Sequence, residues 1–209
     1  MERWPILRIV RLVSLLVVLA AIVAQAKTLA DANAFDTTRF FAFFTIQSNL
    51  VGVAAFSWLV ARGDGPRSRA LELLRAGAAV YLSVTFFVVI FLLSGVDVQL
   101  QLVWVDVVLH KIFPVIVVAD LILDPPRTRL VAQDIVTLLI YPLVWTLFTV
   151  IRGAVDGWYP YPFLDPTHGG YAQVAVTIVA VLIGFIVIAA AIIWIGNWRR
   201  GDARDSQPA

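Results

Sequence analysis

Six long apolar stretches, separated by short polar segments, set the pattern of this chain. They cover residues 6–26, 40–61, 71–93, 103–123, 132–152 and 172–196. Each has about the 20 mostly apolar residues that a helix needs to cross the hydrocarbon core of a bilayer. The segments between them are too short to fold as separate domains. The pattern therefore predicts an all-α, polytopic membrane protein, with a six-helix transmembrane bundle over residues 1–198 and a polar, disordered tail at 199–209.

Basic residues are distributed unequally between the two sides of the predicted bundle. One side carries only Lys27, Arg39 and Arg152. Because basic residues are enriched in cytoplasmic loops, the opposite side is predicted to be cytoplasmic, and both termini and the tail lie there. The arginines on that side are Arg3, Arg8, Arg11, Arg62, Arg67, Arg69, Arg75, Arg127, Arg129, Arg199, Arg200 and Arg204.

The composition agrees with a lipid environment. Apolar residues make up 61% and charged residues 14% of the chain, and the mean hydropathy is +0.89. The absence of cysteine excludes disulfides, thiolate chemistry and Cys-ligated metals. No nucleic-acid-binding motif is present. Arginine dominates over lysine, and alanine and valine are frequent, which is typical of a GC-rich bacterial genome and predicts the plasma (inner) membrane of such a bacterium.

The first apolar stretch has two interpretations. Arg8 and Arg11 precede an apolar run, and Ala24-Gln25-Ala26 is similar to the small-residue cleavage site of a secretory signal peptide. Cleavage would leave five spans without changing the orientation of the rest. We expect retention, because the basic residues before the first span match those after the last one, as in an even-numbered bundle.

Polar residues recur at helical spacing in three of the predicted spans. At 100° per residue, each set shares one helix face. The sets are Thr45, Ser48, Asn49 and Gly52 in the second span; Asp106, His110, Val117 and Asp120 in the fourth; and Asp134, Thr137, Tyr141, Trp145 and Arg152 in the fifth. In lipid, such stripes are buried only against one another. They predict a polar pocket, or a polar packing seam, inside the bundle.

Thr45 and His110 form the candidate catalytic pair, because a hydroxyl and an imidazole are the two parts of a minimal nucleophile–base pair. Such groups are costly within lipid and suggest a function. Both predicted helices enter from the outer side. At ~1.5 Å per residue, Thr45 lies about 7–8 Å past Phe40, and His110 about 9 Å past Trp104. We expect the two side chains to meet in the outer leaflet.

Neighbouring residues extend this candidate site. Asp106 lies one turn from His110 and is placed to orient its ring. Pro114 lacks the N–H that would bond the His110 carbonyl, which predicts a kink there. Arg152 closes the fifth span at the outer face, where a guanidinium suits a carboxylate or phosphate.

Each of these residues also has a structural interpretation. The Thr45 hydroxyl is able to bond back to Phe41 in its own helix, and His110 to act as a donor between helices. Helix packing is the structural role of Ser48, Asn49 and Gly52. At the cytoplasmic boundary, solvation or pairing with Arg127 and Arg129 is expected for Asp120, Asp124 and Asp134. An interfacial aromatic belt would be formed by Trp158, Tyr159, Tyr161 and Phe163.

A set of short motifs resembles a known family. The motifs are Thr45-Ile46-Gln47-Ser48-Asn49, His110 followed by Pro114, Tyr141-Pro142, Arg152-Gly153, and Tyr159-Pro160-Tyr161-Pro162-Phe163-Leu164-Asp165-Pro166 before Gly170-Tyr171. Together they resemble a predicted six-transmembrane bacterial family related to the androgen-induced membrane proteins of animals. The animal relatives hydrolyse fatty acid esters of hydroxy fatty acids with an intramembrane threonine nucleophile and a histidine. The resemblance implies these roles for Thr45 and His110.

The expected function is therefore an intramembrane threonine hydrolase of lipid esters. His110 would take the Thr45 proton, and Asn49 is the candidate oxyanion donor. Further candidates for binding the substrate are Ser48, Tyr141 and Arg152. Arg152 would bind the free carboxylate of the substrate. The partner is a membrane lipid or fatty acyl ester, and no cofactor or metal is expected.

Three alternatives remain open at this point. A carrier or channel would use Asp106, His110 and Arg152 as a polar path that continues through Asp120, Asp134 and Tyr141. A haem or metal protein would use His110 and His168. A lipid sensor or scaffold would keep the pocket without chemistry. A serine hydrolase of the Gly-x-Ser-x-Gly type is disfavoured, because that motif is absent from the sequence.

Overall fold

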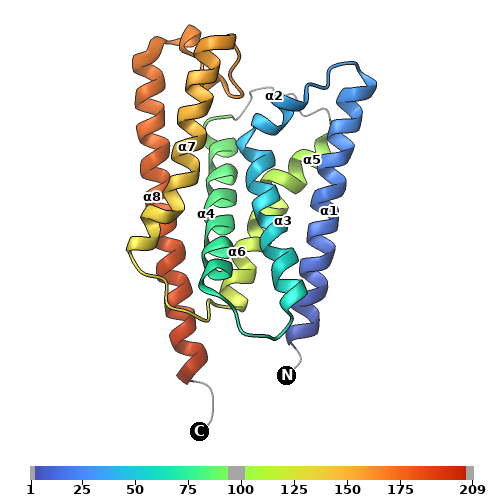
Figure 1. Ribbon diagram of the computed structural model, residues 1–209, viewed down its shortest axis with the longest axis vertical. Helices are drawn as coiled ribbons and strands as arrows, with labels where there is room; N and C mark the ends of the chain where they lie inside the picture. Colours follow the sequence, from blue (N-terminus) through green and yellow to red (C-terminus); the bar gives the residue numbers. More distant parts are fainter. Residues whose placement is uncertain (1–2, 94–101, 206–209) are drawn as a thin grey trace.

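The computed structural model describes residues 3–93 and 102–205, and all regular elements in these residues are helical. The long helices run side by side (Figure 1). The elements are α1 (Arg3–Asp31), α2 (Thr37–Ala42), α3 (Phe44–Arg62), α4 (Arg69–Phe91), α5 (Val103–Val107), the π-helical η1 (Val108–Ile112), α6 (Phe113–Leu123), α7 (Gln133–Asp156), the 3₁₀ turns η2 (Pro162–Leu164) and η3 (Pro166–His168), and α8 (Gly170–Asp205).

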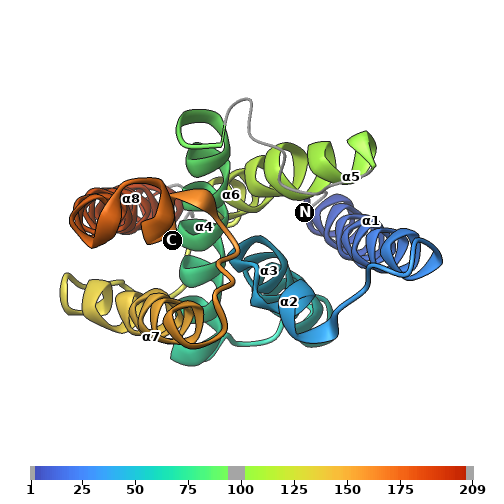
Figure 2. The same ribbon diagram turned by 90° about the horizontal axis from the view of Figure 1, so that it is seen from above.

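Helix α4 forms the centre of the bundle. It packs against α3, α6, α7 and α8, and Figure 2 shows it between the α7–α8 pair and the α3–α6 side. Helix α1 covers the far side by packing on α3, α5, η1 and α6. The first residues of α1 and the last residues of α8 lie at the same end of the bundle (Figure 1), as in a chain with an even number of crossings.

Five helices are long and apolar enough to cross a membrane. They are Pro5–Asp31, Phe44–Arg62, Arg69–Phe91, Gln133–Asp156 and Gly170–Gly201. Many large apolar side chains on them face outward, as lipid contact requires, such as Ile9, Val136, Leu147 and Val179. The chain is thus an all-helical, multi-pass membrane protein. The fourth predicted span, which is not among these five, is helical from Val103 to Leu123, but it consists of the three consecutive segments α5, η1 and α6. Six crossings and cytoplasmic termini stay predictions.

The second predicted span is not one continuous helix, which corrects the sequence interpretation. The helix is interrupted at Phe43, whose ψ of 126° is extended, and α3 begins at Phe44. The carbonyls freed by the break find side-chain donors. Gln47 Nε2 bonds the Phe41 carbonyl at 2.7 Å, and Trp145 Nε1 bonds the Ala42 carbonyl at 2.9 Å. Because these groups are satisfied, the break is stable within the bundle, and it places Thr45 in the first turn of α3.

The kink expected before Pro114 takes the form of a π-helical turn. Residues Val108–Ile112 form η1, and the N–H of Phe113 bonds the Val108 carbonyl five residues back. Since Pro114 has no N–H to donate to the His110 carbonyl, the regular ladder is interrupted at this point. Such π-bulges shift the direction of a side chain relative to a regular helix and are frequent at functional sites. Here His110 lies at the middle of the bulge.

The predicted disordered tail is helical over most of its length, so that expectation was wrong. Helix α8 continues to Asp205, and residues 206–209 lie outside the described residues. The rings of Trp194 and Trp198 stack at 5.9 Å, and the Arg199 guanidinium lies over Trp198. Arg199 Nε also bonds the Ile122 carbonyl at 3.3 Å. These contacts extend the helix beyond the apolar stretch.

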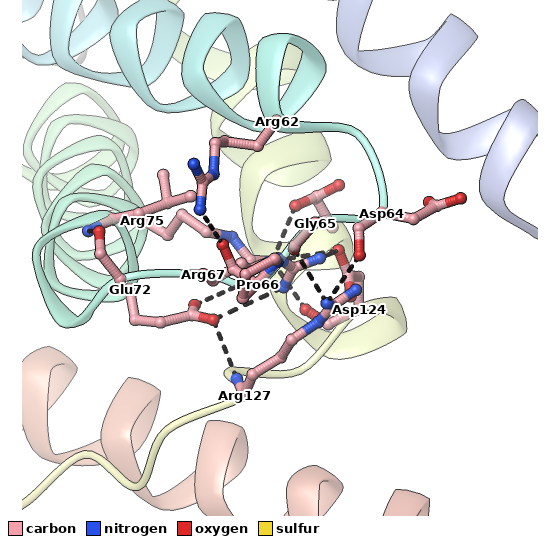
Figure 3. A network of polar contacts seen from close by, with 12 residues as sticks. Arg62, Asp64, Gly65, Pro66, Arg67, Glu72, Arg75, Asp124 and Arg127 are labelled. Carbon is pink, nitrogen blue, oxygen red and sulfur yellow. Dashed lines mark hydrogen bonds and ion pairs between the residues drawn. The ribbon is translucent and has the colours of Figure 1, made fainter.

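Buried ion pairs join the helices at the end of the bundle where α1 begins (Figure 3). Arg11 Nε bonds Asp120 Oδ1 at 2.6 Å, and its Nη2 bonds Asp124 Oδ2 at 2.5 Å. Arg67 also bonds Asp124. Arg75 bonds Glu72 at 2.9 Å and Asp120 at 3.1 Å. The cluster thus balances three buried cations with three buried anions, which keeps the cost of burying charge low.

The pairing expected for the acidic residues at this end was wrong. Asp120 and Asp124 are buried and pair with arginines from α1, α4 and the α3–α4 loop, not with Arg127 or Arg129. Asp134 is buried and bonds Arg69 at 2.6 Å. The sequence interpretation assumed solvent at the boundary, whereas the close approach of α1, α4 and α6 excludes it.

Candidate functional site

Thr45, His110 and Asp106 form a hydrogen-bonded row near the start of α3. Thr45 Oγ1 lies 3.2 Å from His110 Nε2, and His110 Nδ1 lies 2.8 Å from Asp106 Oδ1. Thr45 and His110 are both buried, with 7% and 3% of their surface exposed. Because the Asp106 carboxylate accepts only, Nδ1 carries the proton and Nε2 is left as an acceptor for the Thr45 hydroxyl.

Local structure explains how the three side chains meet. Asp106 on α5 and His110 on η1 are four residues apart, so they lie on the same helix face. Thr45 is the second residue of α3, where unpaired backbone N–H groups give the helix end a partial positive charge. Its hydroxyl does not bond back to Phe41, whose carbonyl accepts from Gln47 instead. The structure thereby brings together the two residues that the sequence singled out.

Asn49 and Ser48, one turn further along α3, both hydrogen-bond the Thr45 backbone carbonyl. Asn49 Nδ2 bonds the Thr45 carbonyl at 2.8 Å and the Leu109 carbonyl at 3.2 Å. Ser48 Oγ lies 3.1 Å from the same Thr45 carbonyl and 3.2 Å from Thr85 Oγ1. Since both amide hydrogens of Asn49 are engaged by backbone carbonyls, none is left for an oxyanion. Asn49 instead ties the helix of the hydroxyl to the helix of the imidazole.

Arg152 and Tyr141 lie apart from the row. Arg152 bonds Asp156 at 3.0 Å and the Thr38 hydroxyl at 3.2 Å, and it stacks over Trp158 at 5.3 Å. The Tyr141 hydroxyl donates to Gln47. Neither residue lines the cavity beside Thr45; Arg152 lines a smaller one with Gln47 and Trp158. The structure thus ties both to the support of the α2–α3 break.

An apolar cavity opens beside Thr45, and His110 is not among its lining residues. Its volume is about 60 Å³, and α4, α7, α8 and the loop before α8 form its walls. Leu143 is 45% exposed on the outer face of α7, so the cavity reaches the lipid-facing surface. The lining is Phe44, Thr45, Val84, Thr85, Val88, Val89, Leu93, Pro142, Leu143, Trp145, Thr146, Tyr161, Phe163, Leu164, Ile178, Val181, Leu182 and Phe185.

Tyr161 completes the site and was missed by sequence reasoning, which placed it in an interfacial aromatic belt. It is buried, and its hydroxyl oxygen lies 3.3 Å from both the Thr45 hydroxyl oxygen and the Thr45 backbone nitrogen. Its ring stacks on Phe163 at 5.2 Å. The prolines on both sides of Tyr161 hinted at a fixed backbone, but nothing in the sequence distinguished its hydroxyl from those of its neighbours.

The second histidine lies away from this site. His168 ends η3, is exposed, and lies 3.5 Å from Asp165. Over residues 3–93 and 102–205, no group of three or more His, Cys, Asp or Glu side chains is arranged to hold a metal ion. Both ring nitrogens of His110 are engaged by hydrogen-bond partners. The arrangement of these groups suits proton transfer rather than metal coordination.

Comparison with known proteins adds no assignment. No protein-family model matches the chain, and no curated protein or solved structure is significantly similar to it.

Proposed function

We propose that the protein is an intramembrane hydrolase of lipid esters in which Thr45 is the nucleophile and His110 the base. The observation that carries the proposal is the hydrogen-bonded row Thr45–His110–Asp106, with an apolar cavity directly beside the hydroxyl. The nucleophile, its base and the group that orients the base follow one another as in other hydrolytic triads. The resemblance to a bacterial family related to the threonine-dependent animal hydrolases points to the same chemistry.

The reaction follows from the hydrogen bonds of the row. The Thr45 hydroxyl gives its proton to His110 Nε2 as Oγ1 attacks the ester carbonyl carbon, and the carbonyl electron pair moves onto oxygen. Asp106 stabilises the imidazolium that forms. When the intermediate collapses, the alcohol leaves with the proton from His110 and an acyl-threonine remains. Water attacks this ester and gives its proton to His110. The bond between the acyl carbon and Thr45 Oγ1 then breaks, His110 returns the proton to Oγ1, and the fatty acid is released. A positioned base typically contributes about 10²–10⁴-fold.

The substrate class follows from the cavity walls. A cavity lined almost wholly by aliphatic and aromatic side chains suits an acyl chain, and Thr45 lines it where the carboxyl end of that chain would lie. The exposed Leu143 marks a route through which a lipid would enter from the bilayer. A lipid ester or fatty acyl ester therefore suits the site, and no cofactor is needed.

A carrier is the main alternative, since the same cavity would hold a lipid without chemistry. The polar path that this alternative needs is weakened by the ion pairs of the described structure. Asp120 is bonded to Arg11 and Arg75, and Asp134 to Arg69. Opening a path past them would break buried ion pairs, which is costly.

Labelling of the detergent-purified full chain with a fluorophosphonate probe tests the proposal. We expect the probe to modify Thr45 in the wild type, and Thr45→Ala and His110→Ala to abolish labelling. Thr177→Ala is the matched control, because Thr177 is a helix threonine that, among the described residues, bonds only the Gln173 carbonyl, at 3.1 Å. The carrier would be favoured if the wild type melts cooperatively, and is therefore folded, but is neither labelled by the probe nor active on fatty acyl esters.

A further inference from the structure

The hydroxyl of Tyr161 has an unusual set of neighbours. Tyr161 lies in the loop between α7 and α8, next to η2, and reaches into the bundle as far as the first turn of α3. The backbone N–H group of Thr45 donates to its oxygen at 3.3 Å. The only other group within hydrogen-bonding distance in the described structure is the Thr45 hydroxyl oxygen, also at 3.3 Å.

These contacts fix the direction of each proton. Because a backbone N–H only donates, the Tyr161 oxygen accepts at the bond from the Thr45 nitrogen, and its own proton must go elsewhere. The Thr45 hydroxyl gives its proton to His110 Nε2, which leaves the Thr45 oxygen free to accept. The Tyr161 proton therefore points at the Thr45 oxygen, the atom that would attack the substrate. Accepting a bond from a helix N-terminus polarises this O–H group and strengthens it as a donor.

We propose that Tyr161 is a further catalytic residue, whose hydroxyl donates the hydrogen bond that stabilises the oxyanion. This inference rests on the proposed function. In the resting state the donor is held on the Thr45 oxygen. As that oxygen forms its bond to the carbonyl carbon, it becomes a weakly accepting ether-type oxygen, and negative charge appears on the adjacent carbonyl oxygen, which is the stronger acceptor. The Tyr161 O–H then turns to that oxygen, with no proton transferred and no covalent bond made to Tyr161.

The other hydroxyl groups in the cavity wall are committed elsewhere. Thr146 Oγ1 donates to the Pro142 carbonyl at 2.8 Å, and Thr85 Oγ1 to the Tyr81 carbonyl at 3.0 Å. Asn49, the oxyanion donor expected from the sequence, has both amide hydrogens on backbone carbonyls. Among the described lining residues, Tyr161 is thus the hydroxyl donor aimed at the nucleophile.

The environment of Tyr161 keeps the donor protonated and fixed. Burial raises the pKa of the Tyr161 phenol above its usual value, and the hydrogen bonds with the Thr45 hydroxyl and backbone oppose this only in part. The ring packs parallel to Phe163 and edge-on to Phe43 at 5.6 Å. Because these ring contacts do not involve the hydroxyl, its removal is expected to leave the ring in place.

Hydrolysis of a p-nitrophenyl ester of a medium-chain fatty acid by the purified full chain tests the inference. For Tyr161→Phe we expect kcat to fall by about 10²–10³-fold, the effect of losing one oxyanion donor, with KM nearly unchanged. Tyr81→Phe is the matched control. The buried Tyr81 hydroxyl bonds the Leu138 carbonyl at 2.8 Å, outside the cavity. The melting temperature of Tyr81→Phe should therefore fall by about as much as that of Tyr161→Phe, while its kcat stays at the wild-type value.

The outcomes separate this inference from the proposed function. If wild type and Tyr161→Phe hydrolyse the ester equally and Thr45→Ala does not, the hydrolase stands and the role of Tyr161 is overturned. If wild type is inactive, both fail together. Should Tyr161→Phe not fold, 3,5-difluorotyrosine at position 161 keeps the hydroxyl but makes the phenol more acidic. The alkaline fall of kcat should then move to lower pH, and an unchanged profile would overturn the inference.

Discussion

Asp106 holds His110 through two bonds, since Nδ1 of the ring lies 2.8 Å from the Asp106 carboxylate and 3.2 Å from its backbone carbonyl oxygen. Both partners accept, so the ring is held in one tautomer with Nε2 facing Thr45. The carboxylate is 28% exposed and also pairs with Lys111 at 3.2 Å. The pair thus combines an orienting contact with a negative charge that favours the imidazolium formed during catalysis.

Replacing Asp106 by asparagine should therefore reduce activity far more than stability. The amide nitrogen of Asp106→Asn would compete as a donor towards Nδ1 and favour the tautomer with the proton on Nε2, which cannot accept from Thr45. We expect kcat for ester hydrolysis to fall by about 10²–10⁴-fold. Asp31→Asn removes an exposed carboxylate whose one ion pair within the described residues is with Lys27 of α1, and it should leave kcat unchanged. Equal kcat for the two variants would exclude Asp106 from the mechanism.

Asn49 is expected to act through position rather than by contact with the substrate. Asn49→Ala removes the bonds to the Thr45 and Leu109 carbonyls, at a cost of about 0.5–1.5 kcal/mol for each bond lost, although the Thr45 carbonyl keeps its bond from Ser48 Oγ. Both melting temperature and kcat should drop. Asn197→Ala is the matched control, because its amide likewise bonds a backbone carbonyl, that of Leu130 at 2.7 Å, far from the site along the chain.

The pattern of the two asparagine variants decides between roles. A positioning role for Asn49 predicts loss of both properties in Asn49→Ala and loss of melting temperature alone in Asn197→Ala. If Asn49→Ala instead kept its melting temperature and lost kcat, the amide would be donating to the oxyanion, as the sequence first suggested.

The close packing of Gly153 against Tyr159 gives a further prediction. A Cβ at Gly153 would lie 2.1 Å from the Tyr159 ring, so the ring has to move. Since Tyr159 is two residues before Tyr161, Gly153→Ala should displace the loop that carries the Tyr161 hydroxyl. We expect about 1–3 kcal/mol of destabilisation from overpacking, together with reduced ester hydrolysis. Gly184→Ala, where nothing lies within 4 Å of the added Cβ, should change neither property. Full activity in Gly153→Ala would show that the loop tolerates this shift.

The sequence predicted the helical membrane class and the meeting of Thr45 with His110, because helical periodicity and the cost of polar groups in lipid act within single segments. It did not predict the break at Phe43. That break depends on donors from Gln47 and from Trp145 of α7, a distant part of the chain. Tyr161 was missed for the same reason. A loop tyrosine is usually interfacial, and only the tertiary fold shows that its hydroxyl reaches Thr45.

The buried contacts of Arg11 predict that the first span is retained in the mature protein. Arg11 bonds both Asp120 and Asp124 and is 2% exposed, while Val18 and Ala21 of the same helix belong to the core. Cleavage after Ala26 would remove this helix and leave two buried carboxylates short of a partner. The intact mass of the purified chain should therefore include residues 1–26, and a mature chain beginning at Lys27 would contradict the prediction.

A substitution probes the same contact without relying on processing. Arg11→Gln removes one cation from the balanced cluster of Arg11, Arg67, Arg75, Glu72, Asp120 and Asp124, and breaking such a buried pair costs about 3–5 kcal/mol. We expect a clear fall in melting temperature in detergent. Arg8→Gln is the matched control, since Arg8 is exposed on the same helix, and it should melt as the wild type does. If the two variants melted alike, α1 would be packed on the bundle without depending on this ion pair.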